Sequence, residues 1–134
     1  MAASIKRGFD NMDVDFVHAY LTQSYWAAGR TKADVIKSMK NAICFGVFVE
    51  KQQVGFARIV TDQVVFAWLM DVFIDEMHQG KGFGKKLIDA ILKIPELENV
   101  NGVGLRTKDA HGLYRQYGFD AIPDGSTWML RNKK

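Results

Sequence analysis

The sequence lacks most of the features that would place a chain in a disulfide-stapled, secreted or membrane class. It has one cysteine, Cys44, so no internal disulfide can form, and a lone thiol is typical of a reducing compartment. It has no run of about 18 apolar residues, the length that a membrane-spanning helix requires. Its first residues lack the apolar core of a secretory leader. We therefore expect a cytoplasmic protein with no membrane partner.

The sequence also lacks a cluster of metal-ligating residues and a large excess of charge of one sign. The three histidines, His18, His78 and His111, lack the spacing of a metal site, so we expect no metal. The 18 basic residues are dispersed and face 15 acidic ones, for a formal net charge of +3. This balance permits an anionic ligand. A nucleic-acid-binding domain would instead need a clustered basic face with interleaved aromatic residues, so we rank that function last and expect no nucleic acid.

What the chain does have is an ordinary globular composition. Of its 134 residues, 48% are hydrophobic and 25% are charged, with no repeat and no linker. This length suits one core, and we expect a single domain over residues 1–134.

The spacing of apolar residues predicts helices over 13–24, after Thr31, from about Gly82 to Pro95, and over 109–119. Asp13 and Thr31 are the expected N-caps, and Gly118 is the expected C-terminal glycine. Segments rich in β-branched and aromatic residues predict strands over 43–50, 53–61, 64–75, 100–107 and 126–132. The first two form a hairpin, and the long apolar run over 64–75 is typical of a central strand buried on both faces. Helices alternate with strands only in the second half, so we expect a mixed α/β (α+β) sheet with helices on its faces.

The stretch HQGKGFGKKL, residues 78–87, is the least ordinary part of the chain. Glycines alternate with charged and aromatic residues, and an apolar helical pattern follows at once. A glycine-rich turn at a helix N-terminus lets a phosphate approach unpartnered backbone N–H groups. Lys81, Lys85 and Lys86 add positive charge, so the segment predicts a phosphate or pyrophosphate site. A tight turn without a ligand is the alternative, although one glycine would suffice for it.

Two common phosphate motifs do not fit this stretch. A P-loop needs a serine or threonine after Gly-Lys, and none is present. A dinucleotide fingerprint needs glycine where this chain has Lys85.

The segment instead resembles the pyrophosphate loop of the GNAT superfamily of acetyl-CoA-dependent N-acetyltransferases, which reads Q/R-x-x-G-x-G/A after a strand. Residues 79–84, QGKGFG, match that loop. Residues 110–119, AHGLYRQYGF, look like the family's A-x-x-L-Y-x-x-x-G-F helix and strand start. The two motifs stand in the family's order, separated by one helix and one strand. The sequence departs from the family at Thr107, where many members have asparagine.

The resemblance implies a GNAT-like fold, with a mixed, mostly antiparallel sheet of about six to seven strands and about four helices. It implies an enzyme that moves the acetyl group of acetyl-CoA directly to a primary amine of a small molecule or peptide. A homodimer is compatible with an apolar final strand. The residues expected along acetyl-CoA are Val72, Phe73, Ile74, Gln79, Gly80, Lys81, Gly82, Phe83, Gly84, Lys85 and Thr107.

Two residues are candidates for catalysis. By the resemblance, Tyr114 is the general acid that protonates the leaving thiolate, and a phenol is a reasonable donor for that step. Asp71 is the candidate base, because burial in an apolar strand raises the pKa of a carboxylate. Its alternative is a structural aspartate paired with Arg58, and a water chain could replace it as base. A backbone N–H near Phe73 or Ile74 would polarise the thioester carbonyl.

The role of one segment stays open from sequence alone. Tyr25, Trp26 and Arg30 join the first two helices and could face a substrate or cap the sheet. Cys44 is expected to pack in a strand rather than act as a nucleophile. The alternative function is an acyl-CoA-binding or regulatory module of the same fold without turnover.

Overall fold

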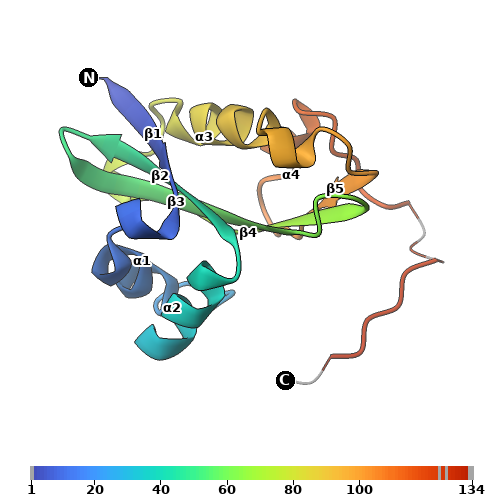
Figure 1. Ribbon diagram of the computed structural model, residues 1–134, viewed down its shortest axis with the longest axis horizontal. Coiled ribbons are helices and arrows are strands. Elements are labelled where there is room, and N and C mark those ends of the chain that lie inside the picture. The colour runs from blue at the N-terminus through green and yellow to red at the C-terminus, as the bar shows by residue number, and fades with distance from the viewer. Residues whose placement is uncertain (1, 124, 126, 133–134) are drawn as a thin grey trace.

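The computed structural model describes residues 2–123, 125 and 127–132, and its elements follow one another along the chain as Figure 1 shows. Five strands and four helices are present in the described residues: β1 (Ala3–Arg7), α1 (Val14–Leu21), α2 (Lys32–Lys40), β2 (Ile43–Val49), β3 (Gln52–Thr61), β4 (Phe66–Ile74), α3 (Phe83–Leu92), β5 (Gly102–Gly104) and α4 (His111–Arg115). Short 3-10 turns occupy Phe9–Asn11, Glu76–His78 and Pro95–Leu97. None of the helices in the described residues is both long and apolar enough to cross a bilayer.

The strands form one mixed sheet in the order β1-β2-β3-β4-β5. Neighbours from β1 to β4 are antiparallel, whereas β5 runs parallel to β4. Helices α1 and α2 lie on one face of the sheet, and α3 and α4 lie on the other (Figure 1). The expected mixed, mostly antiparallel sheet with about four helices is therefore confirmed. The sheet has five strands in the described residues rather than six to seven.

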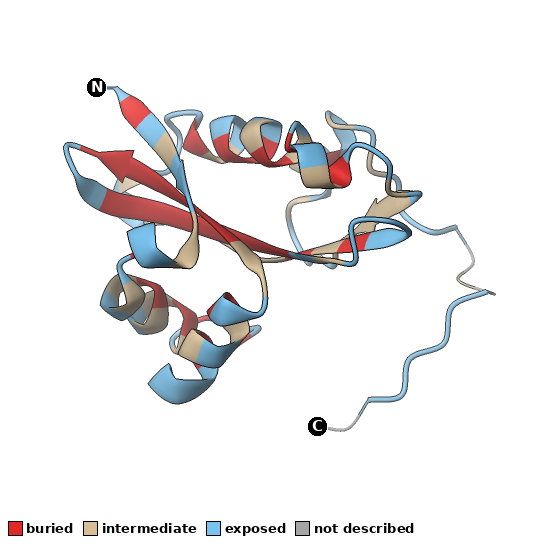
Figure 2. Ribbon diagram, viewed as in Figure 1, coloured by how far each residue is buried: buried red, intermediate tan, exposed pale blue. Residues whose placement is uncertain are grey.

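The core is divided by the sheet into two apolar clusters, and the middle strands are buried from both sides (Figure 2). Leu87, Ile88 and Ile91 of α3 pack on one face with side chains of β2, β3 and β4. Val17 and Leu21 of α1 pack on the other with α2. This two-sided burial explains the continuous apolar sequence of β2 and the nearly unbroken burial along β3.

The N-terminal helices begin where their capping residues predict. The Asp13 carboxylate accepts a hydrogen bond from the Phe16 N–H at 3.1 Å, and the Thr31 hydroxyl accepts one from the Asp34 N–H at 3.1 Å. Each cap satisfies a backbone donor that has no partner inside its helix. Both predicted starts are confirmed.

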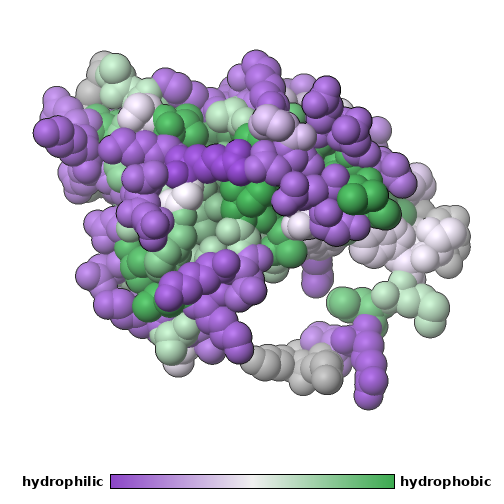
Figure 3. Space-filling view, viewed as in Figure 1, coloured by the Kyte–Doolittle hydropathy of each residue, from purple (hydrophilic) through white to green (hydrophobic). Residues whose placement is uncertain are grey.

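Two parts of the sheet differ from the sequence-based expectation. Strand β1 was not predicted, because this short edge strand, ASIKR, contributes only Ala3 and Ile5 to the core and its other side chains are polar. The predicted final strand over 126–132 is wrong for residues 127–132, which form no strand; residue 126 lies outside the described residues. Most of this segment extends away from the body (Figure 3), although the Trp128 ring lies 6.0 Å from the Trp68 ring of β4. Met129 and Leu130 are exposed, and no described strand pairs with the segment to supply a hydrogen-bonding ladder.

Candidate active site

Strand β4 is open on one edge where the expected cofactor arm would lie. Strand β5 pairs with β4 only from Phe66 to Trp68. Beyond Trp68, β4 continues to Ile74 and is hydrogen-bonded, within the described residues, only to β3. Backbone donors and acceptors on that edge are available to a ligand, because a peptide-like chain can pair with an open strand edge.

The glycine-rich turn follows directly at the end of this open edge. The Gln79 side chain donates a hydrogen bond to the Ile74 carbonyl oxygen at 2.9 Å, which ties the turn to β4. Gly80 and Gly82 have φ values of +79° and +81°, a conformation that other residues adopt at a cost. Helix α3 then begins with no side chain of the described residues capping it, so its first N–H groups have no hydrogen-bond partner in that part of the chain.

The turn keeps its outer surface bare. A Cβ atom built at Gly80 or Gly82 would meet no heavy atom within 4 Å, and one at Gly84 would meet only Ile74, at 4.0 Å. Gly84 has no positive φ, so backbone conformation does not explain its lack of a side chain. An oxyanion lying against the helix start would explain it, because a glycine lets the ligand approach the backbone closely.

Two of the three lysines at this turn are free to face an anion. Lys81 and Lys85 are exposed and form no ion pair with a described residue. Lys86 instead donates a hydrogen bond to the Ala3 carbonyl oxygen of β1. The positive charge expected here is therefore carried by Lys81 and Lys85 together with the N-terminus of α3.

The side chains expected beside the cofactor arm point in different directions. Val72 and Ile74 are half-buried and pack with the α3 cluster. Phe73 is buried on the opposite face and stacks on Tyr20, with ring centroids 3.9 Å apart. Phe83 is also buried, so only the backbone of Phe73 and Phe83 is available to a cofactor. The Thr107 hydroxyl accepts a hydrogen bond from the Ala110 N–H at 3.1 Å at the start of α4, which uses one of its two acceptor positions.

Tyr114 lies in the α3-side core and makes an edge contact with Phe119. Its hydroxyl has no hydrogen-bond partner among the described residues, yet it is not sealed from solvent. Burial, together with the nearby Asp109 carboxylate, raises the pKa of Tyr114 to about 12. The phenol is therefore neutral at physiological pH and holds the proton that a general acid must donate. Tyr117 fixes α4 to α3, because its hydroxyl donates to the Lys85 carbonyl oxygen at 3.0 Å.

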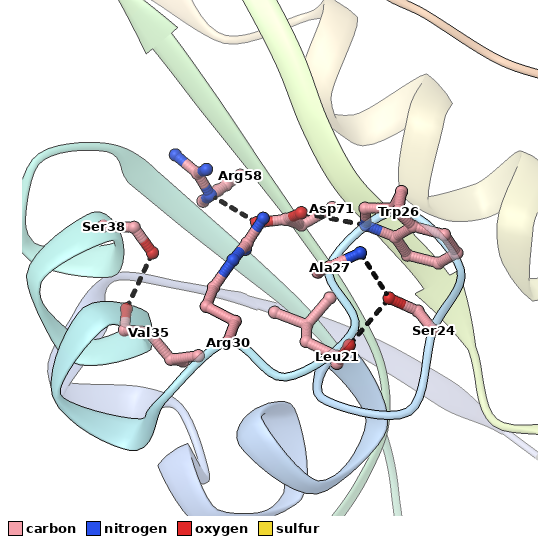
Figure 4. A network of polar contacts seen from close by, with 9 residues as sticks. All are labelled: Leu21, Ser24, Trp26, Ala27, Arg30, Val35, Ser38, Arg58 and Asp71. Carbon is pink, nitrogen blue, oxygen red and sulfur yellow. Dashed lines mark hydrogen bonds and ion pairs between the residues drawn. The ribbon is translucent and has the colours of Figure 1, made fainter. Parts of the chain in front are cut away.

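Asp71 is ionised, and its expected raised pKa is wrong. Its Oδ2 accepts hydrogen bonds from Arg58 Nε and Arg30 Nη1, both at 2.7 Å, and its Oδ1 accepts one from Trp26 Nε1 at 3.0 Å (Figure 4). Burial alone raises the pKa of Asp71, but the two arginines outweigh burial and hold this pKa below its usual value. The structural pairing with Arg58 is the alternative that the structure shows. A carboxylate that binds two guanidinium groups is a poor proton acceptor near neutrality.

A pocket of about 870 Å³ opens beside this network. It is lined by the α1–α2 loop with Tyr25, Trp26 and Arg30, by α2, and by Arg58 and Val60 of β3. The loop is held in place by Ser24, whose hydroxyl donates to the Leu21 carbonyl oxygen at 2.7 Å and accepts from the Ala27 N–H at 3.1 Å (Figure 4). Of the two readings of the Tyr25–Trp26 pair, the structure favours the one in which they wall a pocket. Lys37 and Ser38 of α2 also line it, and nothing in the sequence singled them out.

Cys44 is fully buried, and its thiol donates to the Met39 carbonyl oxygen at 3.3 Å. Burial raises the pKa of this thiol to about 11, so it is protonated at neutral pH and packs as a core side chain.

Comparisons with known proteins agree with the fold and with both motifs. The family model described as "Acetyltransferase (GNAT) domain" matches residues 40–121, which include the glycine-rich turn and Tyr114. The chain belongs to this acetyltransferase family. A crystal structure assigned to the GNAT family from Xanthomonas campestris pv. campestris is 35% identical, with a TM-score of 0.95, and the match covers 99% of this chain and 94% of that one.

Two further relatives extend the comparison. The chain is 30% identical to GCN5-related N-acetyltransferase 2, chloroplastic, from Arabidopsis thaliana; that match covers 60% of this chain but only 32% of the plant protein. The chain therefore spans only part of the length of the curated relatives it matches. A predicted acetyltransferase from Clostridium acetobutylicum, crystallised with acetyl-CoA, has the same fold, with a TM-score of 0.73 at 12% identity over 98% of this chain and 96% of that one.

Proposed function

We propose that this protein is an N-acetyltransferase that moves the acetyl group of acetyl-CoA directly to a primary amine, with residues 1–134 acting as one catalytic domain. The observation that carries the proposal is the bare, uncapped start of α3 at the end of the open edge of β4. An anion site and an open strand edge therefore lie one after the other in space. The pyrophosphate and the amide-bearing arm of acetyl-CoA have that same order.

In this proposal the turn from Gln79 to Lys85 binds the pyrophosphate through backbone N–H groups, with Lys81 and Lys85 supplying charge. The backbone of Val72, Phe73 and Ile74 pairs with the cofactor arm, and an N–H of this segment polarises the thioester carbonyl. A relative with the same fold was crystallised with acetyl-CoA, which supports acetyl-CoA as the ligand in this proposal.

Tyr114 is proposed as the acid that protonates the departing thiolate. Its neutral phenol keeps its proton through the physiological pH range, since its pKa lies at about 12. We assign removal of the amine proton to water rather than to Asp71, because the Asp71 carboxylate is already shared by two arginines.

The pairing of Asp71 with two arginines also supports a second candidate, an acyl-CoA-binding or regulatory module without turnover, because it leaves this carboxylate a poor base. An experiment in two stages separates the two functions. Calorimetric titration with acetyl-CoA tests the cofactor site, and thiol release across a panel of primary amines tests transfer. Binding with no transfer to any amine would favour the module, and no binding at saturating acetyl-CoA would reject both functions.

A further inference from the structure

Arg58 is a buried cation whose hydrogen-bonding capacity is only partly used. Its side chain is 8% exposed, and its Nε donates to Asp71. Its two Nη groups have no hydrogen-bond partner among the described residues, and they point away from Asp71 (Figure 4). These Nη groups are not sealed from solvent, and because Arg58 lines the pocket, a ligand in the pocket can reach them.

The charges around the pocket leave a positive excess. Arg30, Arg58 and Lys37 contribute three positive charges, whereas Asp34 and the underlying Asp71 contribute two negative ones. The Asp71 carboxylate already accepts hydrogen bonds from both arginines, so it cannot neutralise each of them. The side-by-side Nη groups of an arginine match the two oxygens of a carboxylate, which they bind as a parallel pair of hydrogen bonds.

The pocket is also placed to deliver an amine to the reaction. Asp71, which holds both arginines, directly precedes Val72 on the open edge of β4. Trp26 and Tyr25 wall the pocket, and Lys108, from the loop after β5, lies over the Tyr25 ring at 5.2 Å. The α1–α2 loop and the β5–α4 loop thus meet beside the gap between β4 and β5. A volume of about 870 Å³ is in the range of small-molecule sites.

We propose that this pocket binds the acceptor, and that the acceptor is a small amino carboxylate whose carboxylate is held by the free Nη groups of Arg58 together with Arg30. The amine of the same molecule then points toward the thioester beside Val72. This assignment of a substrate class rests on the proposed function, but the carboxylate site can be tested without turnover.

The binding test uses matched ligands that differ only in the carboxylate. An N-acetylated amino acid and its primary amide are titrated calorimetrically into the protein without acetyl-CoA. We expect the acid to bind on the order of tenfold to a hundredfold more tightly than the amide, the range for hydrogen bonds to a charged group. Equal binding of the two, or binding of neither, would overturn the proposal.

The kinetic test compares α-, β- and γ-amino acids with their primary amides in the thiol-release assay, with rates corrected for the fraction of neutral amine. At least one amino acid is expected to exceed its amide in kcat/KM by a similar factor. Amides that react as well as the acids, or transfer to peptide amines with no dependence on a carboxylate, would overturn the proposal.

Two variants assign the effect to the arginines. Arg58→Lys keeps a cation beside Asp71 but cannot also present paired N–H groups, and Arg30→Gln removes one charge at the pocket wall. In either variant the acid-to-amide ratio is expected to fall to within about threefold of one, while acetyl-CoA affinity is unchanged. The control is Lys51→Gln, an exposed residue of the β2–β3 turn, which should keep the wild-type ratio.

The outcomes for the two proposals are distinguishable. If the wild-type protein does not bind acetyl-CoA, the proposed function is rejected. The titrations with acid and amide would still test the carboxylate site. A wild-type ratio that persists in both folded arginine variants would overturn this proposal alone.

Discussion

Gly84→Ala should act in opposite directions on the free protein and on its complex with acetyl-CoA. Gly84 is the second residue of α3, has no positive φ, and would place a Cβ no closer than 4.0 Å to Ile74. Alanine therefore fits the free protein. Because glycine is less favourable than alanine in a helix by up to about 1 kcal/mol, the variant should be as stable as wild type or more so. For a chain of this size that gain corresponds to roughly 2 to 5 °C in Tm.

The same methyl group should weaken acetyl-CoA binding, because it occupies the bare surface where the pyrophosphate is proposed to lie. Loss of one hydrogen bond to a charged group costs about 1.5 to 3 kcal/mol, or roughly tenfold to a hundredfold in Kd. At acetyl-CoA equal to 100 times the wild-type Kd, ligand stabilisation is about 2.7 kcal/mol. It should fall to about 1.4 kcal/mol for a tenfold loss of affinity and to about 0.4 kcal/mol for a hundredfold loss, by the same mass-action relation.

The assay is a set of thermal unfolding curves with and without acetyl-CoA, joined to a calorimetric Kd. Gly112→Ala is the matched control, since it is the same substitution in α4, at a glycine whose added Cβ also meets nothing within 4 Å. It should leave acetyl-CoA affinity unchanged. If Gly84→Ala raises Tm and binds acetyl-CoA as tightly as wild type, the glycines serve only the turn and the cofactor assignment of this segment is refuted.

Further substitutions and pH address the catalytic residues and the buried network. Gly82→Val, which adds a branched side chain at φ +81°, should abolish detectable acetyl-CoA binding, and unchanged affinity would contradict the proposed pyrophosphate site. Tyr114→Phe should lower kcat by about 10²- to 10⁴-fold with acetyl-CoA affinity retained, and normal turnover would reject its role as acid. Asp71→Asn should lower the free energy of unfolding by about 3 to 5 kcal/mol, measured in urea, because Arg30 and Arg58 lose their shared counter-charge; a loss below about 0.5 kcal/mol would mean that the network does not stabilise the fold. Because the folded pKa of Asp71 is lowered, its contribution should be complete above the unfolded pKa of about 4 and lost as pH falls through the folded value, and a loss that begins near pH 6 would contradict this. The Tyr114 pKa is raised to about 12, so stability should decline as pH rises from about 10 to 12.

Features set by neighbouring residues were predictable from the sequence. The caps at Asp13 and Thr31, the β2–β3 hairpin and the start of α3 after Gly82 depend on hydrogen bonds or φ values within a few residues. The family motifs at 79–84 and 110–119 are local in the same sense. These motifs depend on glycines that leave the backbone bare and on one phenol, and both can be recognised from residue identity alone.

Features that depend on distant pairing were not predictable. Arg30 and Asp71 are 41 residues apart, and only the arrangement of the α1–α2 loop over β4 brings them to 2.7 Å. The sequence suggested that burial would raise the Asp71 pKa, but it could not show that a second arginine would reach the same carboxylate. The predicted strand over 127–132 was wrong because a distant partner that the prediction required is missing among the described residues. Its β-forming residues pair with none of the described strands.

The irregularity in β4 explains how one strand serves both proposed binding sites. Phe56 of β3 pairs with Phe73, but Arg58 pairs with Met70, so β4 carries one extra residue there. Asp71 takes up this bulge with φ +54°, a conformation that aspartate tolerates better than most residues. In a regular strand Ala67, Leu69, Asp71 and Phe73 would share a face. The bulge instead returns Val72 and Ile74 to the α3 side, with Ala67 and Leu69, and turns the Asp71 carboxylate toward Arg30 and Arg58. The strand can therefore offer its backbone edge to acetyl-CoA while its carboxylate organises the arginines of the opposite pocket. Backbone strain that places two such sites next to each other is typical of functional positions.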